Sequence, residues 1–350
     1  MQRRDFARTF VLVMSLLGGA CSKSSAPTSS APPDASAASP PAASASASAT
    51  PTSPVTLRVG HDLWVGYSGV FLAKELGYFR EVGIELELKP FSNPGDTLPA
   101  LVSDQLDVGL TTLQNLAVLN GNGDSDVVAI AVLDSSNGAD AIVARKSIKS
   151  FAELKSKKVA LTLGEVNHFL FLVGAKRAGL DASAIKITSM SADDAGAAFV
   201  AGKVDAAVTW EPWVTKAIKS GGHVIFTSAD VPDTIMDSVA VRRAKLQGKD
   251  STYKAFLSAI DKGVAYLRSE PDKAATLIGK YLNAPADDVK GMLSGDKIYG
   301  LADNQKLFGT PSAPGPAYQS MKSVVEFALE SKLIKKAPDA NKLFEPSLVR

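Results

Sequence analysis

Apolar runs alternate with helical patterns through most of this chain. Ten runs have the length of β-strands, and most are apolar along their whole length, which is typical of sheets covered on both faces. They lie at residues 55–60, 84–91, 106–111, 127–133, 140–145, 158–163, 185–190, 205–210, 223–228 and 238–243. Between them, apolar residues recur at helical spacing, for example over 68–79 and 167–178. The alternation predicts an α/β fold with largely parallel strands.

After residue 250 the pattern becomes helical. Helices are expected over 251–268, 270–282, 286–294 and 315–333. Pro271 and Pro285 mark two of the helix starts. We expect these late helices to pack on the outside of the region that begins at Val55.

Residues 101–116 and 199–214 resemble two copies of one motif, LVSDQLDVGLTTLQNL and FVAGKVDAAVTWEPWV. A constant offset of 98 pairs Asp107 with Asp205, Thr111 with Thr209, Thr112 with Trp210 and, further away, Gly66 with Gly164. A chain that builds one α/β unit twice forms two similar lobes. Small molecules bind in the clefts between such lobes.

The first 20 residues have the features of an export signal, namely a basic start, a short apolar run and small residues before a cleavage site. These are Arg3, Arg4 and Arg8, then Phe10 to Leu17, then Gly18, Gly19 and Ala20. The only cysteine follows at once, and Leu17-Gly18-Gly19-Ala20-Cys21 resembles a bacterial lipoprotein signal with Cys21 as the lipidated residue. An ordinary secretory signal with an incidental cysteine is the alternative. Arg3-Arg4-Asp5-Phe6 also resembles a twin-arginine signal, so either export route is compatible with the sequence.

Residues 22–54 consist almost entirely of Ser, Ala, Pro and Thr, with Lys23 and Asp34 as the only charges. Such a stretch buries too little apolar surface to offset the entropy of ordering, so we expect 21–54 to be a lipidated cysteine followed by a disordered tether. The anchor would be the membrane partner of an exported protein, periplasmic or extracytoplasmic.

The composition excludes several classes of function. With 38 basic and 36 acidic residues and no Lys/Arg block, the chain does not have the charge pattern of a nucleic-acid-binding protein. No nucleophile elbow, Walker loop, dinucleotide fingerprint or H-E-x-x-H motif is present. His168 has no second His or Cys nearby to complete a metal site. We therefore expect a monomer without catalytic residues, metal or cofactor.

Seven segments, in order, resemble the solute-binding proteins of nitrate/taurine/sulfonate-type ABC importers, a superfamily that includes binders of a thiamine pyrimidine precursor. The segments are Trp64-Val65-Gly66-Tyr67, Phe71 to Phe79, Gly83 to Leu86, Leu106 to Gly109, Asp140 to Ala144, Ser150 to Ala160 and Asp205 to Pro212. The resemblance covers about 55–310. One departure is Ser156, where the family often has glycine.

The resemblance implies a two-lobed, type II periplasmic-binding-protein-like α/β fold, with two mixed, mainly parallel sheets flanked by helices and a two-stranded hinge. The first lobe would comprise 55–144 and 236–350, and the second 145–235, with crossings near 142–146 and 234–239. It implies a non-enzymatic component that captures a small polar molecule and delivers it to ABC permease subunits. A non-transport sensor lipoprotein and a pyrimidine-precursor synthase-like enzyme on the same fold are the alternatives.

In such folds, ligands lie at the carboxyl ends of strands and face helix N-termini. The residues at those positions are Trp64, Tyr67, Thr111, Thr112, Asp134, Asn137, Glu165, His168, Trp210, Glu211 and Asp237. Trp64 and Trp210 would stack on the ligand from opposite lobes, although packing within each lobe is the alternative. The two threonines would reach it with hydroxyl groups or would cap a helix. For His168, a surface position at a helix start is the alternative.

None of these strand-end loops contains Lys or Arg, which a small anion would prefer as a partner. Glu165, Glu211 and Asp237 would supply acceptors instead. Two effects oppose this inference, because helix N-termini alone can hold an anion and Glu211 can complement its own helix. The sequence therefore favours an amine-bearing sulfonate or a heterocycle over nitrate.

Overall fold

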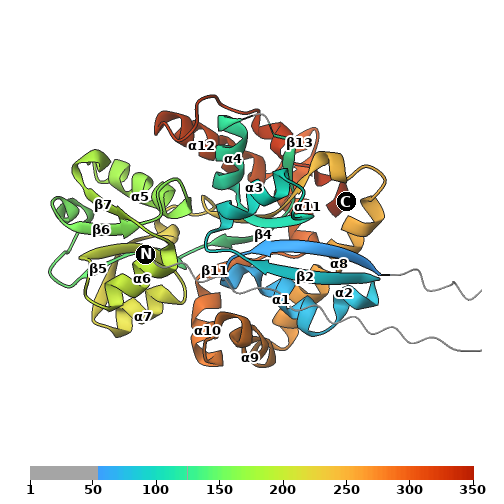
Figure 1. Ribbon diagram of the computed structural model, residues 1–350, viewed down its shortest axis with the longest axis horizontal. Coiled ribbons are helices and arrows are strands. Elements are labelled where there is room, and N and C mark those ends of the chain that lie inside the picture. Colours follow the sequence, from blue (N-terminus) through green and yellow to red (C-terminus); the bar gives the residue numbers. More distant parts are fainter. Residues whose placement is uncertain (1–53, 124) are drawn as a thin grey trace, which may run out of the picture. The chain divides into compact units, whose positions relative to one another are not determined.

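The computed structural model describes residues 54–123 and 125–350 (Figure 1). The expected signal peptide, Cys21 and all but the last residue of the expected tether lie outside the described residues. Residues 51–350 belong to one unit of the chain. Within the part of the chain that is described, no helix is both long and apolar enough to cross a bilayer.

All ten expected strands form. They are β1 Val55–His61, β2 Ile84–Pro90, β3 Val108–Thr112, β4 Val127–Ser136, β5 Asp140–Arg145, β6 Lys158–Leu161, β7 Lys186–Ser189, β8 Ala206–Trp210, β9 Gly222–Thr227 and β10 Met236–Arg242. Three strands of two or three residues were not expected, because such lengths carry no period. These are β11 Asp296–Ile298, β12 Gly309–Thr310 and β13 Ala313–Pro314.

The strands form two large sheets that repeat the same order. The first sheet runs β11-β4-β10-β3-β1-β2 and the second β7-β6-β8-β5-β9. We call each sheet with its helices the first and the second lobe. Read from β2 and from β7, the two orders match strand for strand. The pairing registers match as well, since Val59 lies opposite Val108 and Val159 opposite Ala206. The two sheets therefore repeat one unit, with an offset of 98 between β3 and β8 and of 100 between β1 and β6.

Each sheet contains one strand that has come from the other lobe. β10 runs antiparallel to both of its neighbours, β3 and β4, and β5 runs antiparallel to β8 and β9. The strands on either side, β1 to β4 in one sheet and β6 to β9 in the other, each share one direction. This confirms mixed sheets with one prevailing strand direction. The reversed strand follows directly from the crossing, because the chain enters the new lobe from its neighbour.

The first crossing lies earlier than expected. Residues 140–144 already pair with β8 in the second sheet, so the chain crosses at 137–139 and not near 142–146. The second crossing, 228–235, overlaps the expected segment. The Ser136 and Ser228 hydroxyl oxygens lie 2.8 Å apart, and the Gly138 N–H donates to Ser228 Oγ at 2.7 Å. The two crossings are thus bonded to each other.

Twelve α-helices cover the sheets in the described residues. They are α1 Ser68–Glu75, α2 Tyr78–Glu81, α3 Thr97–Val102, α4 Leu113–Asn122, α5 Val166–Arg177, α6 Ala192–Val200, α7 Trp213–Lys219, α8 Asp250–Ser269, α9 Pro271–Leu282, α10 Ala286–Ser294, α11 Leu301–Phe308 and α12 Pro316–Glu330. In the first lobe, α1 and α2 lie on one side of the sheet and α3, α4 and α12 on the other (Figure 1). The single helix expected over 68–79 is two helices, because Gly77 between them is left-handed with φ of 80°.

The repeated aspartates have the same structural role in both lobes. Asp107 Oδ2 accepts the Arg58 backbone N–H at 3.0 Å, and Asp205 Oδ2 accepts that of Lys158 at 2.8 Å. Each carboxylate thereby ties the start of one strand to its parallel neighbour. The repeat in the sequence preserves this bond.

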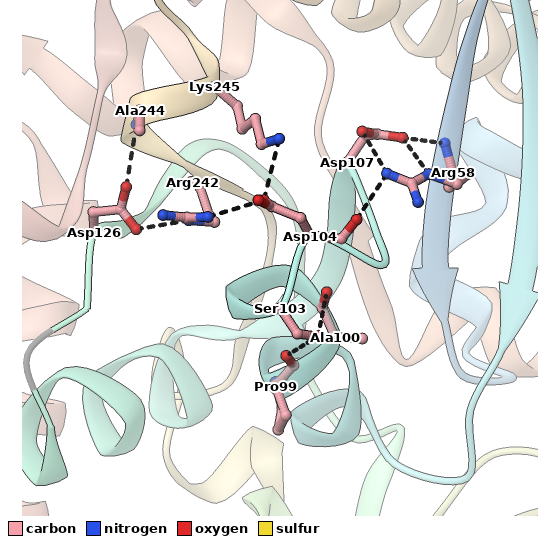
Figure 2. A network of polar contacts seen from close by, with 10 residues as sticks. All are labelled: Arg58, Pro99, Ala100, Ser103, Asp104, Asp107, Asp126, Arg242, Ala244 and Lys245. Carbon is pink, nitrogen blue, oxygen red and sulfur yellow. Dashed lines mark hydrogen bonds and ion pairs between the residues drawn. The ribbon is translucent and has the colours of Figure 1, made fainter.

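Around Asp107, the carboxylates at this edge of the first sheet are all paired with cations (Figure 2). Arg58 Nε donates to Asp107 at 2.9 Å, and Arg242 bridges Asp104 and Asp126 at 2.9 and 3.0 Å. Lys245 also pairs with Asp104. Hydrogen bonds from these partners hold the pKa values of Asp104, Asp107 and Asp126 below their ordinary range. This group of carboxylates and cations lies at the ends where β3 and β4 begin, and we call it the paired edge.

Helix α1 is held by a close crossing with α8. A Cβ atom built on Gly263 of α8 would lie 2.2 Å from the backbone oxygen of Gly69 in α1, too close for any side chain. The contact matters because α1 begins directly after the loop that contains Trp64 and Tyr67. This glycine pair therefore positions a loop of the candidate site.

We expect Gly263→Ala to lower the free energy of unfolding by about 2–3 kcal/mol, because the methyl group forces α1 and α8 apart. Urea unfolding followed by circular dichroism measures the change. The control is Gly291→Ala in α10, where nothing lies within 4 Å of the added Cβ. That substitution should be neutral or stabilise by up to about 1 kcal/mol through helix propensity. Equal effects of the two variants would contradict the close crossing.

Candidate functional site

The carboxyl ends of the strands of the first lobe meet the start of β10 at one buried place. Asp62 directly follows β1, and Asp134 lies near the end of β4. Asp237, at the start of β10, is directly opposite both Thr112 of β3 and Asp134 of β4. Directly opposed residues of adjacent strands share a face, with Cβ atoms about 5 Å apart. The sheet register therefore brings buried carboxylates together.

Two aromatic residues of the loop before α1 bind these carboxylates. The Tyr67 hydroxyl donates to Asp237 Oδ1 at 2.8 Å, and Trp64 Nε1 donates to Asp134 Oδ2 at 3.3 Å. Gly66 lies between them, and a Cβ there would be 2.0 Å from Asp134 Oδ2. Both aromatic side chains are buried. Of the residues expected at the site, Trp64, Tyr67, Asp134 and Asp237 are thus in mutual contact.

Two further aspartates join this place. Asp140 opens β5 of the second lobe and lies opposite Trp210, just as Asp237 lies opposite Thr112. The sequence repeat, which pairs Thr112 with Trp210, could have identified it. Asp296, in β11 beside β4, has no such signal, because its strand has only three residues. We call Asp62, Asp134, Asp140, Asp237 and Asp296 the carboxylate cluster.

Burial dominates the electrostatics of the carboxylate cluster. Loss of solvation raises the pKa of Asp140 to about 7 and that of Asp237 to about 6. The pKa values of Asp62, Asp134 and Asp296 are raised well above the ordinary range by burial, and next by repulsion from neighbouring carboxylates. No Lys or Arg of the described residues forms an ion pair with any member of the cluster. The site is acidic and uncompensated.

The two threonines at the end of β3 differ in role. Thr112 Oγ1 accepts the Asn115 N–H at 3.1 Å and caps α4. The buried Thr111 hydroxyl has no hydrogen-bond partner among the described residues. Of the two, Thr111 is therefore the one with a hydroxyl available to another molecule.

Glu165 connects the two lobes. Its carboxylate accepts Asn115 Nδ2 at 2.6 Å and the Gly95 N–H at 3.3 Å, both from the first lobe. A Cβ atom at Gly95 would lie 2.3 Å from the Glu165 carboxylate, so a side chain there would displace this contact. Burial raises the Glu165 pKa. The expected ligand acceptor is, in this structure, a contact between lobes.

Three other expected residues make local contacts. His168 Nδ1 accepts the Gly164 N–H at 3.2 Å within its own loop, and burial lowers its pKa. Both oxygens of Glu211 are used by Thr215, through its N–H at 3.0 Å and its hydroxyl at 2.8 Å. In this structure Glu211 thus binds the start of α7. Asn137 lies in the first crossing, where its N–H donates to Gly295 O at 2.8 Å.

The carboxylate cluster draws its members from five different strands or strand ends. Among residues 54–123 and 125–350, no group of three His, Cys, Asp or Glu side chains is placed to hold a metal ion.

Sequence comparison places these features in a family. Residues 64–274 match the family described as NMT1/THI5 like, a span that contains the aromatic loop, both crossings and most of the carboxylate cluster. The chain belongs to this family.

This chain is similar to three proteins of known name or structure. A protein of Escherichia coli (strain K12) named for binding aliphatic sulfonates is 28% identical over 252 residues, which cover 71% of this chain and 78% of the relative. The taurine-binding periplasmic protein of the same organism is 24% identical and covers 72% and 80%. The alkanesulfonate-binding protein SsuA of Xanthomonas axonopodis pv. citri, solved with bound MOPS, has a TM-score of 0.71 at 17% identity and covers 85% and 100%. The two-lobed fold of periplasmic binding proteins is thereby confirmed.

We expect Asp140→Asn to stabilise the ligand-free protein at high pH. The folded-state pKa of about 7 lies above the ordinary 3.8, so stability is lost as pH rises through this window and the deficit is complete above it. Removing the buried carboxylate should raise the free energy of unfolding by about 2 kcal/mol or more at pH 8 and change it little at pH 4.

Urea unfolding at the two pH values measures this effect. The control is Asp287→Asn, whose side chain is 94% exposed. It should stay within about 0.5 kcal/mol of the native chain at both pH values. A destabilised Asp140→Asn protein at pH 8 would show that the carboxylate is compensated after all.

Proposed function

We propose that this protein is the extracytoplasmic substrate-binding component of an ABC importer, which captures a small polar molecule between its lobes and delivers it to the permease. Its relatives are periplasmic binding proteins, and one of them is named for taurine. The sulfonate, taurine-like and amine or pyrimidine ligands expected from the sequence are all small and polar.

One observation carries this proposal. Polar groups from both lobes meet at one buried place, with Asp62, Asp134 and Asp237 from the first lobe and Asp140 from the second. Asp140 and Asp237 are close enough that each carboxylate repels the charge of the other. A molecule bound there contacts both lobes and favours the closed arrangement over the open one. The permease would then recognise the closed form.

The experiment combines this protein with a candidate ABC permease and its ATPase from the same organism, in lipid nanodiscs, and follows ATP hydrolysis. An importer component should stimulate hydrolysis when its ligand is present. A non-transport sensor should leave the rate unchanged. Mass spectrometry of the recovered ligand tests the enzyme alternative, because a binding protein returns it unaltered.

We propose that Glu165 is a latch between the lobes. Its bonds to Asn115 and Gly95 join the N-terminal turn of α5 to the first lobe. Each hydrogen bond between the lobes stabilises the closed state relative to the open state. Loss of these two bonds should therefore shift the ligand-free protein toward open states.

Glu165→Ala should therefore enlarge the radius of gyration of the ligand-free protein and weaken ligand binding about tenfold, the value of one or two charge-assisted hydrogen bonds. Small-angle scattering and calorimetry measure the two effects. The control is Glu153→Ala, whose carboxylate bonds only to Lys149 and Ser150 in its own lobe. An unchanged scattering profile for Glu165→Ala would argue against a latch.

We also propose that a lipid on Cys21 anchors the protein, with the Ser/Ala/Pro-rich segment as its tether. Cys21→Ala should release the protein from membranes or block its processing, because no lipid can then be attached. Fractionation of cells followed by immunoblotting measures the distribution. A Ser24→Ala protein, altered just beyond the cysteine, should fractionate like the native chain. Membrane association of Cys21→Ala at the native level would contradict the lipid anchor.

A further inference from the structure

The carboxylate cluster lacks the donors that buried carboxylates require. Its five side chains are between 0 and 9% exposed. Asp62 Oδ1, Asp134 Oδ1 and both oxygens of Asp296 have no hydrogen-bond partner among the described residues. Buried polar atoms in native proteins are almost always bonded, so unbonded acceptors in one place mark a missing donor.

Neutral groups of the site are also unbonded. The indole N–H of Trp210, which is 3% exposed, makes no hydrogen bond. Asp193 lies near it, but Asp193 Oδ1 already accepts Trp213 Nε1 at 2.9 Å. Trp210 shares a sheet face with Asp140, its direct cross-strand partner. The unbonded indole N–H of the second lobe thus lies beside Asp140, the member of the carboxylate cluster that this lobe contributes.

The opposite ends of the same strands show that the lack of cations beside carboxylates is not a general property of this chain. At the paired edge, Asp104, Asp107 and Asp126 all bond to Arg58, Arg242 or Lys245 (Figure 2). Their pKa values are lowered, whereas those of the carboxylate cluster are raised. At the paired edge, the chain itself supplies the cations.

We propose that the ligand is an organic cation with more than one N–H donor, such as an amine, an amidine or a guanidinium compound, held by the carboxylate cluster. The inference rests on the proposed function, because it names the ligand class of the same site. Charge-assisted N–H···O bonds would satisfy the unbonded oxygens, and the aromatic side chains of Trp64, Tyr67 and Trp210 border the site as partners for a cation.

The contacts favour an organic cation over the two other charge classes. An anion such as a sulfonate would find no arginine or lysine paired with the cluster and would be repelled by every member that is ionised. A single metal ion needs converging ligands, and the described residues offer no such set. An extended cation with separate N–H groups meets carboxylates spread over both lobes.

The test uses the purified full-length mature chain, freed of bound molecules by unfolding and refolding. Calorimetry and thermal shift at pH 7.5 compare three sets of probes. These are putrescine, benzamidine and guanidinium; ethanesulfonate, methanesulfonate and nitrate; and Mg²⁺, Ca²⁺ and Zn²⁺. We expect at least one cation of the first set to bind and the anions and metal ions not to bind.

Two variants separate binding from structure. Asp134→Asn and Asp237→Asn keep the shape of the side chain but remove its charge, so each should weaken binding of the cation at least tenfold while leaving the melting temperature equal or higher. Asp287→Asn, at the exposed position, should bind like the native protein. A structural role alone would give the opposite result, with lower stability and unchanged affinity.

The inference is overturned if no organic cation binds, if an anion or metal ion binds more tightly, or if both charge-removing variants bind the cation normally. None of these results decides the importer role, which the ATPase experiment tests separately. Stimulated ATP hydrolysis together with an anionic ligand would uphold the proposed function and refute the cation.

Discussion

The structure depends on one topological constraint, the reversed insertion of a strand at each crossing between lobes. β5 and β10 enter the middle of their new sheets, where they lie between strands that run the other way. A strand that begins at a crossing must begin where its neighbours end. The first residues of β5 and β10 therefore face the last residues of β8 and β3. A side chain at either of these positions therefore lies at the boundary between the lobes, and the surrounding sequence does not change this placement.

This constraint explains why Asp140 and Asp237 are equivalent although nothing nearby in the sequence aligns them. Each opens, or nearly opens, a crossing strand and lies opposite the exit of the repeated strand, Trp210 or Thr112. Burial at such a place is costly for a charge unless a partner neutralises it. At the paired edge, by contrast, Arg58, Arg242 and Lys245 neutralise the carboxylates. The ion pairs and the proposed ligand site thus lie at opposite ends of the same strands.

Much of this arrangement could be predicted from the sequence. The ten apolar runs identified the ten longest strands, and the offset of 98 implied two lobes with matching strand order. Trp64, Tyr67, Asp134 and Asp237 were expected because they lie where strands end. Asp296 could not be found, since its three-residue strand has no period. The contacts of Glu211 and Glu165 could not be predicted for another reason. A carboxylate near a helix start can bond to its own helix, to the opposite lobe or to a ligand, and the sequence pattern is the same in all three cases. Only the positions of its hydrogen-bond partners distinguish these roles.

The contact between Gly66 and Asp134 makes the loop and the strand behind it depend on each other. A Cβ atom at Gly66 would lie 2.0 Å from Asp134 Oδ2 and 2.3 Å from Trp64 Nε1, the two atoms that form the hydrogen bond between loop and strand. A single added methyl group would therefore displace the donor and the acceptor of that bond at the same time. The absence of a side chain at Gly66 thus fixes the position of two others, and the loop cannot be altered at this residue without moving a carboxylate that belongs to a different strand.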